Sequence, residues 1–390
     1  MTAFRIDITD RAIAVVTFDL EGEKINKLST PVGAELEELL RELKENPHLK
    51  GLVLISGKPD IFIAGADIRE ILAIHSAEEG AQKSEHAQRL PNLIESLPFP
   101  TVAAIHGVCL GGGLELVLGC TYRIATSHPK TKLGLPEVQL GILPGMGGCY
   151  RLPKLIGLRS ALEMILAGAT WPAQKALKKG LVNEVVPKEI LLQRAEQAIQ
   201  EKAWKKRQKR FSLLEWALEK NRPGRNFIYR RAKDDIIKRT RGHYPAPLKA
   251  LEVIYEILDR GLTDGLKIES EGFGYLSETA VSKNLIDLFF QSETVKKETG
   301  ILDSSIQPMK IRSAAVVGAG VMGAGIAQLL ADREIPVRLK DVHEQAVAKG
   351  LFHAREIFEK GVLRKRLSQR DLVRKMNFIA PSTEFYGFRK

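Results

Sequence analysis

The chain has 390 residues, of which 44% are hydrophobic and 27% charged, and its formal net charge is +12. This length predicts two or three domains with a substantial core, and the composition is that of an ordinary soluble globular protein. The sequence contains no apolar run long enough to cross a bilayer, and it does not begin with the apolar stretch of a signal peptide. We therefore expect no transmembrane segment and a cytoplasmic location.

The cysteines and histidines argue against a disulfide framework and against a metal site. Cys109, Cys120 and Cys149 are too few and wrongly spaced for either a set of disulfides or a zinc site. The eight histidines show no spacing typical of metal ligands. We expect no bound metal.

The positive charge is concentrated in residues 201–241, which hold 15 Lys or Arg and 5 Asp or Glu, a net charge of +10. A solvated helical surface is the commoner explanation of such a run. A phosphate-bearing cofactor handle, an anionic membrane or a nucleic acid are alternative partners. Because no known RNA-binding or helix-turn-helix pattern accompanies the charge, we expect no nucleic acid partner.

In chain order, strands alternate with helices through about residue 190. Residues 4–8 and 12–18 alternate as a hairpin does, and Pro31 follows Thr30 at the start of an expected helix. The further elements expected from periodicity are strands at 51–56, 101–105 and 122–126 and helices at 30–46, about 80–97 and from about 112. A capping box is expected at Asp67-Ile-Arg-Glu70. This alternation predicts a mostly parallel α/β domain over residues 1–190.

Residues 191–309 show helical patterns with little strand signal, and we expect them to form a helical linker. The third part, residues 310–390, begins with the expected strand Ser313-Ala-Ala-Val-Val317. The sequence Gly318-Ala-Gly320-Val-Met-Gly323 follows this strand and opens a helix.

A second strand of this part ends at Asp341, 18 residues after Gly323. A lone glycine pattern is weak evidence, because an ordinary tight turn can carry it. Between a strand and a helix, with an acid at this distance, it predicts the start of a Rossmann-type NAD-binding domain, with the pyrophosphate at the helix N-terminus and Asp341 on the ribose.

Two carboxylates lie beside glycine-rich turns in the first part. Glu115 follows Gly111-Gly-Gly113, and Glu137 precedes the Pro-Gly sequence that ends at Gly145. Glycine lets a ligand approach the backbone and leaves N–H groups free to stabilise an oxyanion. Two acids beside such N–H groups favour proton chemistry next to a carbonyl. Taken alone, Glu115 would be a helix-surface acid; the flanking glycines and the second acid reverse this interpretation. His106 is expected to be a structural histidine of the turn.

Three segments together resemble the enoyl-CoA hydratase (crotonase) superfamily: Phe62-Ile-Ala-Gly-Ala-Asp67, the glycine turn before Glu115, and Leu135-Pro-Glu-Val-Gln-Leu-Gly141. The order of hydratase, helical linker and glycine fingerprint resembles the multifunctional α-subunits of bacterial fatty acid oxidation complexes. Gly22-Glu-Lys-Ile-Asn-Lys-Leu28 and the 22 residues between the glutamates are closer to the anaerobic-type branch. The resemblance implies an α/β fold of spiralling ββα turns.

The resemblance also implies roles for residues. Glu115 and Glu137 would hold the catalytic water, with Glu115 as base and Glu137 as acid. The N–H groups of Ala66 and Gly112 would form the oxyanion hole, and that of Gly145 would help place the water. The substrate would be a 2-trans-enoyl-CoA thioester, with enoyl-CoA isomerase or 3-hydroxyacyl-CoA epimerase side activity. Asp67 is expected to cap a helix.

For the third part the resemblance implies a 3-hydroxyacyl-CoA dehydrogenase that uses NAD. Its catalytic His and Glu would lie beyond residue 390, so we expect the chain to be an N-terminal fragment without dehydrogenase activity. The resemblance implies a thiolase β-subunit as partner, and we expect an oligomer. Cys149-Tyr150 replaces the usual Thr-Gln of the family, which affects the expected helix packing there.

Two other functions compete with hydration. The same acids could move a double bond instead of adding water, as an isomerase does. Alternatively, the chain could be a catalytically silent scaffold that binds CoA or a nucleotide and docks a partner through its basic segment. Substitution of Glu115 by Gln would change nothing measurable in the scaffold.

Overall fold

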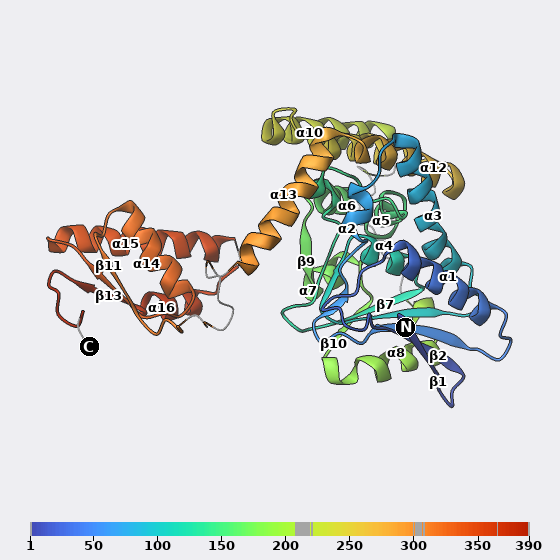
Figure 1. The fold of residues 1–390 in the computed structure, drawn as a ribbon, viewed down its shortest axis with the longest axis horizontal. Helices are drawn as coiled ribbons and strands as arrows, with labels where there is room; N and C mark the ends of the chain where they lie inside the picture. Colours follow the sequence, from blue (N-terminus) through green and yellow to red (C-terminus); the bar gives the residue numbers. More distant parts are fainter. Residues whose placement is uncertain are drawn as a thin grey trace. The chain divides into compact units, whose positions relative to one another are not determined.

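The computed structural model describes residues 2–206, 219, 221–298, 300, 306, 309–364 and 366–388. The chain divides into two compact units, Met1–Lys296 and Lys297–Lys390, and each contains its own sheet with helices packed against it (Figure 1).

The first unit contains two sheets. The larger has the strand order β1-β2-β3-β5-β7-β10 and is parallel apart from the antiparallel hairpin β1–β2; the smaller has the order β4-β6-β8-β9. The strands are β1 (Phe4–Ile8), β2 (Ile13–Phe18), β3 (Gly51–Ser56), β4 (Ile61–Ile63), β5 (Thr101–Ile105), β6 (Val108–Leu110), β7 (Tyr122–Thr126), β8 (Lys132–Gly134), β9 (Thr170–Pro172) and β10 (Glu184–Val186). Because β3, β5 and β7 are each followed by a strand of the smaller sheet, the chain repeats one ββ step, as the expected spiral requires.

Helices surround these sheets. They are α1 (Thr30–Lys44), α2 (Ile68–Leu72), α3 (Ala77–Glu95), α4 (Gly112–Leu118), η1 (Glu137–Leu140), α5 (Gly148–Ile156), α6 (Leu158–Leu166), α7 (Ala173–Lys179), η2 (Lys188–Ile190), α8 (Leu191–Gln200), η3 (Ala203–Lys206), α10 (Arg222–Thr240), α11 (Pro245–Ile257), α12 (Leu262–Ser277) and α13 (Ala280–Lys297). The strands and helices expected from the sequence over residues 4–126 are confirmed, with end points within a few residues.

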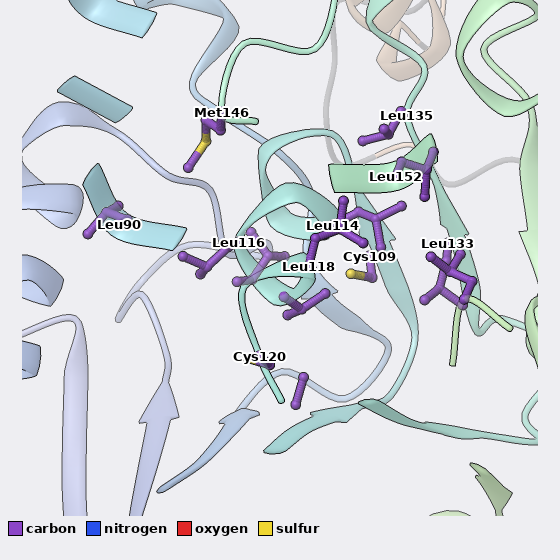
Figure 2. Close-up of a cluster of buried hydrophobic side chains, with 14 of the residues drawn as sticks. Leu90, Cys109, Leu114, Leu116, Leu118, Cys120, Leu133, Leu135, Met146 and Leu152 are labelled. Atoms are coloured by element: carbon purple, nitrogen blue, oxygen red, sulfur yellow. The ribbon is translucent and has the colours of Figure 1, made fainter. Parts of the chain in front are cut away.

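Helix α4 is the most deeply enclosed helix near the glycine turn. Every one of its seven residues is buried. Figure 2 shows Leu114, Leu116 and Leu118 of α4 surrounded by apolar side chains from β6, β8 and α5. A helix that is apolar on all sides must sit inside a core. Its only charged residue, Glu115, is therefore carried into the interior with it.

The helices expected to form a separate linker belong to the first unit. Apolar residues of α11 and α12, among them Ile254 and Phe273, join the same buried cluster as the sheet and α4. This grouping differs from the three-part division expected from the sequence. The reason is that α11 and α12 each carry an apolar face, and the nearest surface that can bury it is that of α3, α5 and α6.

The crossing of α3 and α12 depends on two glycines. A Cβ on Gly274 would lie 2.1 Å from the carbonyl oxygen of Ala77, and a Cβ on Gly80 would lie 2.8 Å from Cα of Gly274. The two backbones are therefore in direct contact, which fixes α12 against the first unit.

The second unit has the three-stranded parallel sheet β11-β12-β13. Its elements are β11 (Ala314–Val317), α14 (Val321–Asp332), β12 (Val337–Lys340), α15 (Glu344–Leu363), α16 (Gln369–Met376) and β13 (Ile379–Ser382). The expected strand, glycine turn, helix and second strand are confirmed. Phe358 of α15 and Leu339 of β12 are at the centre of this unit's own apolar cluster.

Two local expectations are refined. Asp67 caps α2 by accepting the N–H of Arg69 at 3.0 Å, as expected. Glu70 does not complete a capping box, because its carboxylate instead accepts the N–H of Thr30 at the start of α1.

Of the basic segment, residues 207–218 and 220 lie outside the described residues. In the described part, Arg225 of α10 pairs with Asp259 at 2.6 Å.

Among the residues that the structure describes, no helix is both long and apolar enough to cross a membrane.

Substitution of Gly274 by Ala tests the helix crossing. The added methyl group would meet the backbone of α3, so we expect a loss of about 1–3 kcal/mol in the free energy of unfolding of the first unit. All three tryptophans precede residue 297, so tryptophan fluorescence during urea denaturation reports on this unit alone.

Gly33→Ala is the matched control, since Gly33 is also a helical glycine whose Cβ would make only an ordinary contact, 3.6 Å from Leu90. It should be neutral or stabilise the unit by up to about 1 kcal/mol. Equal stability of Gly274→Ala and wild type would refute the close crossing.

Candidate active site

A cavity of about 830 Å³ opens in the first unit. Its walls come from the ends of α1 and α2, from α3, from the glycine turn before α4, from η1 and from α13. Glu115, Glu137, Ala66, Gly112 and Gly145 all line it. The structure thus brings together, in one cavity, the five residues that the sequence singled out for hydration.

Glu115 is held by backbone N–H groups. It lies in the first turn of α4 and is 2% exposed. Its Oε1 atom accepts the N–H of Met146 at 2.7 Å and that of Gly148 at 2.8 Å. Burial raises the pKa of Glu115 to about 7, although these two N–H groups favour the charged form. Glu115 is therefore fixed in place and able to change its protonation near neutral pH.

Glu137 has the opposite environment. It begins η1 and is 8% exposed, and neither carboxyl oxygen has a hydrogen-bond partner among the described residues. Burial, and next the charge of Glu115, raise the pKa of Glu137 well above its ordinary value. A buried carboxyl without partners is stable only in its neutral form. The two acids therefore have different environments, and the expected role of Glu137 as the acid of the pair remains a prediction.

The two residues whose N–H groups are expected to form the oxyanion hole, Ala66 and Gly112, line the cavity together with these acids. The bridge between Leu28 and Ala66 uses the N–H and C=O of Leu28, and within the described chain the N–H of Ala66 has no backbone acceptor. Gly112 is the first residue of α4, where an N–H has no partner inside the helix. A Cβ on Gly112 would lie 3.6 Å from the amide nitrogen of Ala66. The two residues are therefore neighbours at the cavity wall, and the joint binding of one oxygen by their N–H groups remains a prediction.

Gly145 lies in the turn that follows η1. Its carbonyl oxygen accepts the hydroxyl of Ser84 at 2.6 Å, and its N–H contributes, more weakly than those of Met146 and Gly148, to lowering the pKa of Glu115. Its N–H therefore acts on Glu115, and its expected contact with the water remains a prediction.

A third buried carboxylate lies next to these two and was not expected from the sequence. Glu269 of α12 is 0% exposed, and its two oxygens accept the N–H of Gly147 at 2.5 Å and that of Cys149 at 2.8 Å. Burial, and next the charge of Glu115, raise the pKa of Glu269 to about 8. Residues 265–273 hold a lysine, a serine and a second glutamate, so the local sequence does not single out Glu269, and its partner Cys149 lies 120 residues away in sequence.

One arginine lies close enough to Glu115 and Glu269 to influence their pKa values. Arg151 of α5 donates from Nε and Nη2 to Glu95, at 2.9 Å each, and its charge favours the ionised forms of Glu115 and Glu269. Its neighbour Tyr150, where the family usually has Gln, packs against α12: a Cβ on Gly265 would lie 2.5 Å from the Tyr150 ring. The replacement of Gln by Tyr150 therefore lies at a contact between α5 and α12. Helix α5 is formed despite this replacement.

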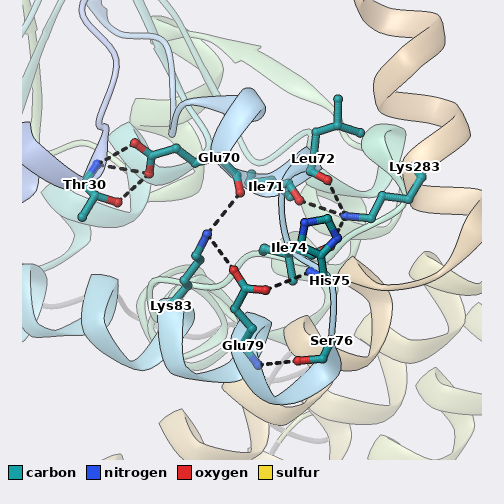
Figure 3. A network of polar contacts seen from close by, with 10 residues as sticks. All are labelled: Thr30, Glu70, Ile71, Leu72, Ile74, His75, Ser76, Glu79, Lys83 and Lys283. Carbon is teal, nitrogen blue, oxygen red and sulfur yellow. Dashed lines mark hydrogen bonds and ion pairs between the residues drawn. The ribbon is translucent and has the colours of Figure 1, made fainter.

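Polar contacts tie α2, α3 and α13 together at the cavity wall (Figure 3). Lys83 contacts the Glu70 carbonyl at 3.5 Å and the Glu79 carboxylate at 3.1 Å. Lys283 of α13 donates to three carbonyls at the end of α2, those of Ile71, Leu72 and Ile74, at 2.6–3.2 Å. These contacts hold α13 over the cavity.

His106 is structural, as expected: its Nδ1 atom lies 2.9 Å from Oγ1 of Thr126, and burial lowers the pKa of His106. Together with Asp60 and His128 it forms a group of side chains whose ligand atoms lie within 4.8 Å of one another. Asp60 is paired with Lys130 at 2.7 Å. Because a lysine already neutralises this carboxylate, the group gives no reason to change the expectation of no bound metal.

The glycine fingerprint of the second unit fits a dinucleotide. A Cβ on Gly318 or Gly320 would meet nothing within 4 Å, which leaves open space over the N-terminus of α14, whereas a Cβ on Gly323 would collide with the carbonyl of Gly318. Asp341 follows β12 and accepts the N–H of Ala319 at 2.6 Å, and this hydrogen bond is the main cause that lowers the pKa of Asp341. The acid is therefore charged and adjacent to the turn.

Comparisons with known proteins agree with these observations. Residues 9–240 match the family model for enoyl-CoA hydratase/isomerase, and residues 313–389 match that for the NAD-binding domain of 3-hydroxyacyl-CoA dehydrogenase. Curated relatives include the fatty acid oxidation complex subunit alpha of Shewanella putrefaciens (strain CN-32), 42% identical over 388 residues, and that of Shewanella halifaxensis, 40% identical over 390. Each alignment covers 99% of this chain and 54% of the relative. The chain spans about half the length of these curated relatives.

Solved structures add the fold. A putative enoyl-CoA hydratase from Streptomyces avermitilis is 19% identical with a TM-score of 0.54, over 74% of this chain and 91% of that one. Human mitochondrial delta3-delta2-enoyl-CoA isomerase is 22% identical with a TM-score of 0.52, over 76% of this chain and all of that one. At these identities the likeness concerns the fold alone, and it confirms the expected crotonase-like fold. Since its family model matches more than half of the residues, the chain belongs to the enoyl-CoA hydratase/isomerase family.

Proposed function

We propose that this chain adds water to 2-trans-enoyl-CoA thioesters, as a step of fatty acid β-oxidation. The observation that carries the proposal is the pair of buried carboxyl groups with different environments, Glu115 held by N–H groups and Glu137 without partners, in one cavity that Ala66 and Gly112 also line. Such a pair supplies a base and an acid at the same pH.

In the proposed reaction, ionised Glu115 takes a proton from water as the water oxygen bonds to Cβ of the substrate. Electrons move from the double bond toward the thioester oxygen, which the N–H groups of Ala66 and Gly112 stabilise. Neutral Glu137 then gives its proton to Cα. The net change is addition of H and OH across the double bond. A proton must pass from Glu115 back to Glu137 to restore the starting state.

In the second unit, we propose that Gly318, Gly320 and the N-terminus of α14 hold the pyrophosphate of NAD, and that Asp341 accepts the ribose hydroxyls. When bound, the nicotinamide would supply hydride transfer for 3-hydroxyacyl-CoA oxidation in the full-length protein. Open space over two glycines and a charged acid beside them support this assignment.

We also propose assembly into a fatty acid oxidation complex, with a thiolase β-subunit as partner, in the cytoplasm. The names of the curated relatives support the complex. The three cysteines are free and buried, which suits a reducing compartment.

Substitution of either acid by Gln tests hydration. With a short 2-trans-enoyl-CoA, we expect Glu115→Gln and Glu137→Gln each to lower kcat by about 10²–10⁴-fold, because each removes one proton transfer. The loss of the conjugated enoyl-thioester absorbance measures the rate, and the exposed Glu21→Gln is the control. Movement of the double bond without water uptake would assign isomerisation instead. Binding of the thioester without turnover by wild type would assign a scaffold.

The pH dependence of kcat tests the assignment of the base. Glu115 must be ionised to accept a proton, and its pKa is raised to about 7, so kcat should fall as the pH decreases through about 7. Glu137 must stay protonated, and burial raises its pKa well above the ordinary value, so any loss of kcat from its ionisation should fall on the alkaline side of the profile. Initial rates at saturating substrate give the profile. A flat profile across this range would contradict the role of Glu115.

NADH binding tests the second unit. We expect Asp341→Ala to weaken NADH binding by about tenfold or more, since it removes a charged acceptor for the ribose hydroxyls. NADH fluorescence titration measures the Kd. Glu359→Ala, at an exposed acid of α15, should leave the Kd unchanged. Equal Kd values for Asp341→Ala and wild type would remove Asp341 from the site.

A further inference from the structure

The N–H groups of residues 146–149 alternate between two carboxylates. Those of Met146 and Gly148 bind Glu115, and those of Gly147 and Cys149 bind Glu269. These residues form the end of the segment 144–149, here called the 144–149 loop, which leads into α5. Because adjacent N–H groups point to opposite sides of the loop, the loop is held from both sides at once.

Glu269 supplies hydrogen-bond acceptors that the 144–149 loop itself lacks. Helix α5 begins at Gly148 with no side-chain cap, so its first N–H groups need acceptors from elsewhere. Glu269 supplies acceptors for Gly147 and Cys149 from α12, 120 residues further along the chain. Gln88 of α3 fixes Glu269 in turn, donating to its Oε1 atom at 3.1 Å.

We propose that Glu269 is a positioning residue that holds the 144–149 loop against Glu115, so that hydration depends on helix α12. The inference rests on the proposed hydration and assigns to it a residue outside the glycine turns. Glu269 does not line the cavity, so it acts on the substrate only through the loop and Glu115.

The charged groups around Glu269 come from four elements. Glu115 lies on α4, Glu137 on η1, and Arg151 and Cys149 on α5; Glu95 of α3 pairs with Arg151. Burial raises the pKa of Glu269 to about 8 and that of Glu115 to about 7. We expect Glu269 to act on Glu115 through the hydrogen-bonded loop, and the test below separates this from an effect of its charge.

The test measures Glu269→Ala and Glu269→Gln. The matched controls are Glu271→Ala and Glu271→Gln, because Glu271 is an exposed acid of the same helix. Alanine leaves Gly147 and Cys149 without acceptors, which loosens the loop and withdraws N–H groups from Glu115. We expect kcat to fall about tenfold or more with KM within about twofold, and the acid limb of the kcat profile to move to higher pH. Glutamine keeps an acceptor oxygen, so it should restore most of kcat.

Two results would overturn the inference: Glu269→Ala behaving like Glu271→Ala, or both Glu269 variants moving the acid limb to lower pH, which would show a charge effect. If Glu269→Ala does not fold, Gln88→Leu, which frees Glu269 from its donor, should give the same shift in weaker form. The pKa of Glu115, followed by NMR of ¹³C-labelled glutamate, gives the same comparison without turnover. Because the NMR comparison needs no turnover, it tests the role of Glu269 even if the wild-type protein does not hydrate the thioester. Such a wild type would reject the proposed function, and the NMR comparison would still decide the role of Glu269.

Discussion

The rest of the site depends on the way in which the 144–149 loop shares its N–H groups between two buried carboxylates. A backbone N–H buried without an acceptor is costly, and a buried carboxylate without donors is costlier still. The N–H groups of the loop donate to Glu115 and Glu269, so the loop gains acceptors and the two buried acids gain donors. The arrangement leaves Glu137 as the one carboxyl of the three without hydrogen-bond partners, and in the proposed reaction this difference separates the acid from the base.

This sharing explains why the first unit extends to residue 296. Helices α11 to α13 could have formed an independent linker, yet α12 crosses α3 at a glycine pair and delivers Glu269 to the loop. Helix α13 closes the cavity wall, where Lys283 binds the carbonyls at the end of α2. A lysine at the C-terminal end of a helix is also favoured by the helix dipole. The part that resembled a connector therefore completes the reactive cavity.

In the second unit, the residues of the glycine turn and Asp341 are brought together by neighbouring elements. Its turn requires Gly323 because the carbonyl of Gly318 approaches it, and Asp341 lies beside the turn because β12 runs parallel to β11. These relations involve neighbouring strands and a few intervening residues. For that reason the glycine pattern, together with its flanking strand and helix and the distance to Asp341, was sufficient to predict the first two strands, the helix between them and the place of the acid.

The sequence by itself determined the main strands and helices over residues 4–126, the first elements of the second unit, and the two acids beside the glycine turns. Periodicity in 51–56 and 30–46, and the glycines before Glu115, are local signals, and local sterics and burial fix what they form. Only the tertiary structure decided that α12 belongs to the first unit and that Glu269 joins the site. A contact between residues 149 and 269 joins two segments far apart in the chain, and no local pattern reports which apolar faces will meet. The different environments of Glu115 and Glu137 were likewise decided by burial and N–H donors that only the assembled fold provides.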